Sequence, residues 1–146
     1  MGDFSIILKD SSYFYVFDLE IFRDRLYAFL SRKSDYLNSN ASIRILSGDK
    51  KSFNEISKIK FDDNDMFIRN TFNDDNKQIF LVTSARSESG AIYVSQDMKN
   101  FKKVYSSDKF GFRSINKFKG TYLAGTDSGG FLVGSKDGEN WDIVAQ

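Results

Sequence analysis

The chain contains no cysteine, no histidine and no proline among its 146 residues. The absence of cysteine excludes disulfides and thiolate chemistry, and the absence of histidine excludes an imidazole base and a histidine-bound metal. Because proline is absent, no strand lacks a backbone N–H for that reason. The formal net charge is only +1, from 21 basic and 20 acidic residues that are well mixed. This balance gives no electrostatic case for binding nucleic acid or an anionic membrane.

Long apolar runs are also missing. The stretch from Phe4 to Leu8 is too short for a transmembrane helix, and Asp3 comes too early for a secretory signal. We therefore expect a soluble protein, with its compartment left open. A chain of 146 residues has the size of one domain and should bury about two-thirds of its unfolded surface.

One short pattern, which we call a box, occurs three times: a serine, an aspartate two residues later and an aromatic residue six residues later. The copies are Ser47, Asp49 and Phe53; Ser95, Asp97 and Phe101; and Ser135, Asp137 and Trp141. The serine and aspartate side chains can accept hydrogen bonds from the backbone of one tight turn, and the aromatic ring can cover that turn. Gly138 suits a positive φ, whereas Met98 and Lys50 at the matching sites indicate a turn that tolerates other residues. We interpret the boxes as structural.

Runs of aromatic and β-branched residues surround each box, and no segment has a helical period. They predict four strands in each of three repeats. The strands are 13–17 with 21–22, 25–30, 42–46 and 53–59; then 67–72, 78–83, 91–94 and 101–105; then 112–118, 121–125, 131–133 and 141–144. The repeats cover approximately 11–61, 62–107 and 108–146 of a single domain, 1–146, with an extra strand, Phe4 to Leu8, inside residues 1–10.

The pattern S-x-D-x-x-x-W/F between two strands resembles the Asp-box of sialidase-like β-propellers, and Ser135 to Trp141 is the copy most similar to it. The resemblance implies an all-β fold of three four-stranded blades, with each box between the third and fourth strands and away from the ligand site. Propellers close with about four to eight blades, so three blades leave two faces without a neighbour.

We therefore expect a half-propeller that completes a six-bladed ring by forming a homodimer. A fragment of a longer protein, or another all-β packing, are the alternatives. In a fan of three blades, side chains of the first and third blades should remain exposed; the examples are Phe14, Val16, Leu26, Leu123 and Val133.

Arg69 and Arg113 occupy matching places in the first strands of the second and third repeats, and Val16 or Phe17 falls there in the first repeat. First strands line the central channel of a propeller. The two arginines are therefore candidates to bind a carboxylate or a sulfate through paired hydrogen bonds. The alternative is that they pair across neighbouring blades or extend into solvent.

Two classes of function fit this description. The first is a non-catalytic binding or scaffolding module that presents residues 31–41 and 84–90 to a glycan or a protein. The second is a sialidase-like glycoside hydrolase whose site is completed by another subunit. The resemblance implies that such a sialidase-like hydrolase would need a tyrosine activated by a glutamate, with a separate aspartate as the acid. Tyr13, Tyr15, Tyr27 and Glu20 supply the residue types but no catalytic spacing, so we predict neither a catalytic residue nor a cofactor.

The run Asp62-Asp63-Asn64-Asp65 could bind calcium, but it lacks the glycine and the bidentate glutamate of a calcium loop. We expect a solvated connection between repeats there, and no metal site.

Overall fold

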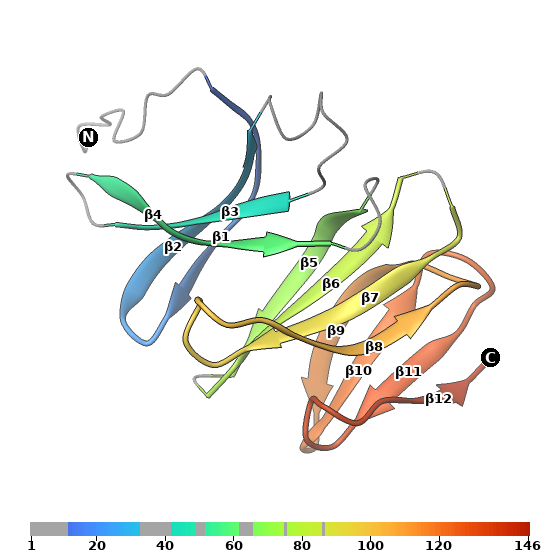
Figure 1. The fold of residues 1–146 in the computed structure, drawn as a ribbon. Helices are drawn as coiled ribbons and strands as arrows, with labels where there is room; N and C mark the ends of the chain where they lie inside the picture. The colour runs from blue at the N-terminus through green and yellow to red at the C-terminus, as the bar shows by residue number, and fades with distance from the viewer. Residues whose placement is uncertain (1–11, 33–41, 49–51, 62–65, 75, 86) are drawn as a thin grey trace, which may run out of the picture.

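The computed structural model describes residues 12–32, 42–48, 52–61, 66–74, 76–85 and 87–146. In this part of the chain the protein is all-β, with three four-stranded antiparallel sheets (Figure 1). The first sheet contains β1 (Tyr13–Phe22), β2 (Arg25–Arg32), β3 (Ser42–Gly48) and β4 (Phe53–Lys60). The second contains β5 (Met66–Asn73), β6 (Gln78–Ser84), β7 (Gly90–Ser95) and β8 (Lys102–Ser107), and the third contains β9 (Phe112–Phe118), β10 (Thr121–Thr126), β11 (Leu132–Ser135) and β12 (Asp142–Ala145).

The strands of every sheet follow one another in sequence order, so each sheet is a meander. The twelve strands predicted from the sequence are confirmed, with bounds that move by only a few residues. The expected strand from Phe4 to Leu8 lies outside the described residues. Two of the hairpin turns are formed by residue pairs with positive φ, Arg23 with Asp24 and Lys119 with Gly120, as the right-handed twist of the strands favours. The described residues contain no helix that could span a membrane.

Two apolar clusters hold the sheets together, and the second sheet contributes to both. One cluster joins the first and second sheets; its fully buried members include Phe29, Ile45, Phe80 and Val82. The other joins the second and third sheets and includes Ile79, Leu81, Phe112 and Ala124. Because side chains alternate across a strand, β6 sends Phe80 to one cluster and Ile79 to the other. All seven residues of β6 are buried, which explains the apolar run from Ile79 to Val82 at its centre.

The outer sheets expose part of the surface that the sequence predicted. Val16 is 60 % exposed, and Leu26 and Leu123 are half-buried. The expectation for Val133 is wrong: its side chain is completely buried in the cluster against the second sheet, because the strand alternation turns it inward. The side chain of Phe14 lies outside the described part of the structure.

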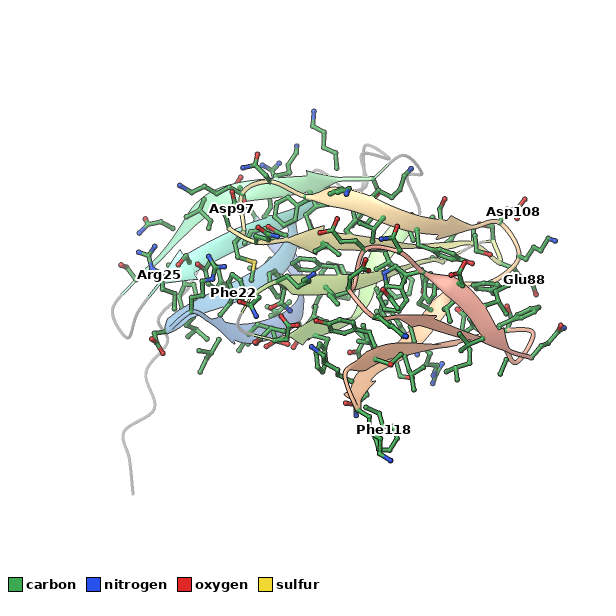
Figure 2. All side chains as sticks on the ribbon, turned by 90° about the horizontal axis from the view of Figure 1, so that it is seen from below. Phe22, Arg25, Glu88, Asp97, Asp108 and Phe118 are labelled. Atoms are coloured by element: carbon green, nitrogen blue, oxygen red, sulfur yellow. The ribbon has the colours of Figure 1, made fainter. Side chains whose placement is uncertain are left out.

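The meander order places two kinds of connection at opposite ends of the sheets. The box hairpins lie at one end, which we call the box end, and the connections from β6 to β7, β8 to β9 and β10 to β11 lie at the other, the loop end. Figure 2 shows Asp97 at the box end, with Phe22 and Arg25 nearby, and Glu88 with Asp108 at the loop end.

Candidate functional site

The second box is a closed network of hydrogen bonds around one carboxylate. Asp97 Oδ1 accepts hydrogen bonds from the backbone N–H groups of Lys99, at 2.9 Å, and Asn100, at 2.8 Å. Asp97 Oδ2 accepts a hydrogen bond from Asn100 Nδ2 at 2.7 Å. The Oγ of Ser95 accepts a bond from the N–H of Met98 at 2.9 Å. The two side chains thus supply the acceptors that the tight turn lacks in its own backbone.

The third box repeats this network atom for atom. Asp137 Oδ1 accepts from the N–H groups of Glu139 and Asn140, both at 2.8 Å, and its Oδ2 accepts from Asn140 Nδ2 at 2.6 Å. The Oγ of Ser135 accepts from the N–H of Gly138 at 2.8 Å. The prediction that serine and aspartate serve the turn backbone is therefore confirmed for both boxes.

Both turns place the third residue after the serine in the left-handed backbone region. Gly138 has a φ of 76° and Met98 a φ of 60°. The prediction that this turn tolerates residues other than glycine is confirmed for Met98, which adopts the same backbone conformation as Gly138. A side chain at positive φ costs roughly 1 to 2 kcal/mol. The Met98 side chain is completely buried in the cluster between the first and second sheets, and this burial offsets the strain.

The first box differs from the other two by one residue of register. Phe53 pairs with Gly48 in the first sheet. In the second sheet Lys102 pairs with Val94, so the aromatic residue before Lys102 comes opposite Ser95. Gly48 therefore takes the place that a serine holds in the other boxes.

Because of this shift, Ser47 does not occupy the position that the sequence predicts for the serine of the first box. Ser47 pairs with Asn54 and lies one residue before the place of Ser95 and Ser135. Asp49 falls outside the described residues. The aromatic Phe53 keeps its role, because it packs against the buried residues Leu30 and Leu46.

Each described box also contacts the sheet that precedes it. Ser57 of β4 donates a hydrogen bond to the carbonyl oxygen of Met98 in the second box. Lys77 donates to the carbonyl oxygen of Asp137 in the third box, and Lys102 of β8 forms an ion pair with Glu139 at 2.8 Å. The boxes therefore join neighbouring sheets as well as closing their own hairpins.

The hydrogen bonds of the boxes stabilise the ionised carboxylates. The backbone N–H of Asn100, followed by that of Lys99, lowers the pKa of Asp97 to about 2. The backbone N–H groups of Asn140 and Glu139 hold the pKa of Asp137 well below its usual range. The two boxes therefore favour folding most when both carboxylates are charged.

We expect the melting temperature to fall as the pH is lowered from about 4 to about 2. A carboxyl whose pKa is lower in the folded than in the unfolded state contributes stability above its unfolded pKa, near 4, and loses it as the pH falls through its folded pKa. Thermal melts at a series of pH values would show this loss. The double variant Asp97→Asn/Asp137→Asn should melt lower at neutral pH and change less between pH 4 and 2. Asp108→Asn, an exposed aspartate outside the boxes, is the control. An unchanged slope in the double variant would contradict the assignment.

Arg69 and Arg113 occupy the same structural position in adjacent sheets. Each is the extra residue of a β-bulge in a first strand: Arg69 falls between Ile68 and Asn70, which pair with consecutive residues of β6. Arg113 falls in the same way between residues paired with Thr126 and Gly125 of β10. Bulges re-aim a side chain and are frequent beside functional sites. Both arginines are exposed. Neither guanidinium group forms an ion pair or a hydrogen bond among the residues that the structure describes.

The first sheet has its bulge at the equivalent place, and Phe17 is the extra residue. Of the two residues proposed from the sequence for this place, Phe17 is therefore the correct one. β1 contacts β5, and β5 contacts β9, so the three first strands lie side by side. We call the surface at Phe17, Arg69 and Arg113 the bulge row.

Polar contacts that the sequence did not reveal fix the chain next to Arg113. The Oγ1 of Thr83 donates to the carbonyl oxygen of Phe112 at 2.6 Å and accepts from the N–H of Phe112 at 2.8 Å. Asp127 accepts from the N–H of Gly111 at 2.9 Å through Oδ1, and its own N–H donates to the Gly111 carbonyl. The strand carrying Arg113 is thus held between the second sheet and the β10 to β11 connection.

A second polar contact joins the first strands below the bulge row. Thr71 Oγ1 of β5 lies 2.9 Å from Asp18 Oδ2 and 2.6 Å from Glu20 Oε1 of β1. Asn73 Nδ2 donates to the other oxygen of Glu20 and to the backbone of Ile21. These carboxylates link the first two sheets. No group of three or more potential metal ligands occurs among the described residues, and the acidic run 62–65 lies outside them.

The connections proposed to face a ligand are described only in part. Residues 33–41 lie outside the described residues. In the connection from β6 to β7, the N–H of Ser84 donates to the carbonyl of Ser89, and the N–H of Ser87 donates to Ser84 Oγ. The hydroxyls of Ser87 and Ser89 are 2.7 Å apart. This connection therefore presents a compact set of hydroxyl groups at the loop end.

Comparisons with protein-family models and with curated proteins find no match to this chain. The likeness of the boxes to those of sialidase-like proteins stays a prediction that rests on the motif.

Proposed function

We propose that the three sheets are blades of a β-propeller similar to the Asp-box, sialidase-like proteins, and that the protein is a non-catalytic binding module. Three features support this proposal. Each sheet is a four-stranded meander, the first strands lie side by side, and the described boxes sit between third and fourth strands at one end. In such an arrangement the ligand site lies away from the boxes.

The proposed ligand is an acidic glycan, and the bulge row is its site. The observation that carries this choice is that Arg69 and Arg113 take the same bulge position in adjacent first strands, exposed and without an ion pair among the described residues. A guanidinium group binds a carboxylate or a sulfate through two parallel hydrogen bonds. Phe17 in the third position is half-buried against the cluster between the first two sheets, and the part of its ring that stays exposed adds an apolar surface of the kind on which sugar rings can pack.

Two of the four side chains suggested for a hydrolase, those of Tyr27 and Glu20, have other roles in this fold. Tyr27 is buried between the first two sheets, where its ring packs edge-on against Phe22. Glu20 accepts hydrogen bonds from Thr71 and Asn73. Both are therefore engaged in holding sheets together, which favours binding over catalysis.

Binding should be tested on an array of sialylated and sulfated oligosaccharides, with the matching neutral sugars beside them. Arg69→Ala and Arg113→Ala should each weaken binding at least about tenfold, since a hydrogen bond to a charged group contributes about 1.5 to 3 kcal/mol. Lys99→Ala/Lys136→Ala removes two exposed charges at the box end and should leave binding unchanged. Unchanged affinity in Arg69→Ala/Arg113→Ala would refute the site, and release of sugar from fluorogenic glycosides would favour the hydrolase instead.

A further inference from the structure

The first and third sheets each have one apolar face that no sheet of the described structure covers. On the first sheet this face carries the exposed side chains of Val16, Leu19 and Ile21 along β1, beside Ala28, Leu30 and Leu46, which are already buried in the single chain. On the third sheet it carries Phe118, Leu123, Leu132 and Val144 around Gly134. Phe118 projects from the body of the molecule in Figure 2.

The box aromatics show which neighbour each open face is built to meet. Phe101 packs into the cluster with the sheet before it, and Trp141 does the same one sheet later. Phe53 has the same place opposite Gly48, and it packs on the open face of the first sheet. This open face therefore corresponds to the face that the second and third sheets turn toward a preceding sheet.

The open face of the third sheet corresponds to the face that the second sheet turns toward the sheet after it. Tyr122 and Val133 point back to the second sheet, so Leu123 and Gly134, the next residues along β10 and β11, point forward. Val144 packs beside them, because a Cβ built on Gly134 would lie 3.0 Å from its Cγ1. The corresponding face of the second sheet, with Ile79 and Val94, is the one covered by the third sheet.

We propose that a second copy of this chain covers both open faces, with the first sheet of each copy packed on the third sheet of the other. The face of the first sheet is the one that packs on a preceding sheet, and the face of the third sheet is the one that packs on a following sheet. Two chains related by a two-fold axis therefore make two identical contacts and close a ring of six sheets. Large side chains at both faces are strongly exposed in a single chain: Leu19 is 58 %, Ile21 65 %, Phe118 63 % and Val144 54 % exposed. Apolar patches of this kind mark interaction surfaces.

The contact rests on the blade arrangement proposed above and does not depend on the ligand. If the chain does not dimerise, the dependence of glycan binding on Arg69 and Arg113 can still be measured on the monomer. Failure to bind glycans would leave the mass in solution unchanged.

Light scattering coupled to size exclusion should give twice the chain mass of 16.7 kDa. Leu19→Asp changes the first open face and Val144→Lys the other, at positions where more than half of the side chain is exposed, so folding should survive. Each variant alone should run as a monomer. An equimolar mixture of the two should recover the dimer, because one of its two contacts contains neither substitution. Ile143→Lys is the matched control: Ile143 is 52 % exposed but pairs with the inward-facing Val133, and its variant should remain dimeric.

Three results would overturn the proposal. A wild-type mass of one chain would exclude the contact, and a mass above two chains would exclude a closed pair. If only one of the two variants loses the dimer, each face must pair with the same face of the other copy, and the proposed contact between the first and third sheets is wrong.

Discussion

Replacing Phe80 by alanine should lower the free energy of unfolding by about 3 to 5 kcal/mol. Phe80 is completely buried in the centre of the molecule. Its ring packs edge-on against Phe29 of the first sheet, at 5.2 Å between centroids, and against Phe101 of the second box, at 5.7 Å. The substitution leaves a cavity in the cluster that joins the first two sheets. Denaturant unfolding would measure the loss.

Phe80→Leu is the control for this prediction. Leucine keeps much of the buried volume but loses the edge-on ring contacts, so its cost should be clearly smaller than that of alanine. A loss below about 1 kcal/mol in Phe80→Ala would contradict the prediction. It would show that the contact between the first two sheets contributes little to folding.

Replacing Trp141 by alanine should have an effect of similar size, about 3 to 5 kcal/mol. The indole is 6 % exposed and lies against Tyr122, with 6.3 Å between ring centroids. Its Nε1 donates a hydrogen bond to the carbonyl oxygen of Gly138 at 3.0 Å. The ring therefore closes the third box and fills the contact with the second sheet at once.

Trp141→Phe separates these two contributions, because the second box has Phe101 in the same place. Phenylalanine keeps most of the apolar area and loses the hydrogen bond, so the expected cost is about 1 kcal/mol. Thermal and denaturant unfolding of both variants would measure the difference. Equal losses in Trp141→Phe and Trp141→Ala would mean that the hydrogen bond, and not the burial of the ring, dominates.

The number, order and approximate bounds of the strands could be predicted from the sequence. Runs such as Gln78–Ser84 are rich in β-branched and aromatic residues, and glycine, aspartate and serine separate them, so local chemistry defines each strand. The side-chain roles of Asp97 and Asp137 were predictable for the same reason, because the bonds they accept come from residues only two or three positions away.

Features that depend on distant parts of the chain could not be predicted. The three boxes have identical spacing, yet Phe53 pairs with Gly48, because the register of that hairpin follows the packing of a whole sheet face. The inward position of Val133 could not be predicted either, because the alternation along one strand does not say which face of the sheet meets a neighbour. The contacts of Thr83 with Phe112 and of Thr71 with Glu20 join residues 29 and 51 positions apart, and no local pattern signals them.

The bulges at Phe17, Arg69 and Arg113 separate residues that fill the clusters between sheets from residues that shape a surface. A residue inside a regular strand belongs to the alternation that fills the clusters between sheets, so its replacement alters packing. Phe17, Arg69 and Arg113 are extra residues outside that alternation. Phe17 still packs against the cluster between the first two sheets, whereas Arg69 and Arg113 are exposed, so mutations at the two arginines can change the charge and shape of one surface while the fold stays intact. The two arginine positions can in this way determine what the surface binds without a compensating change in the packing between sheets.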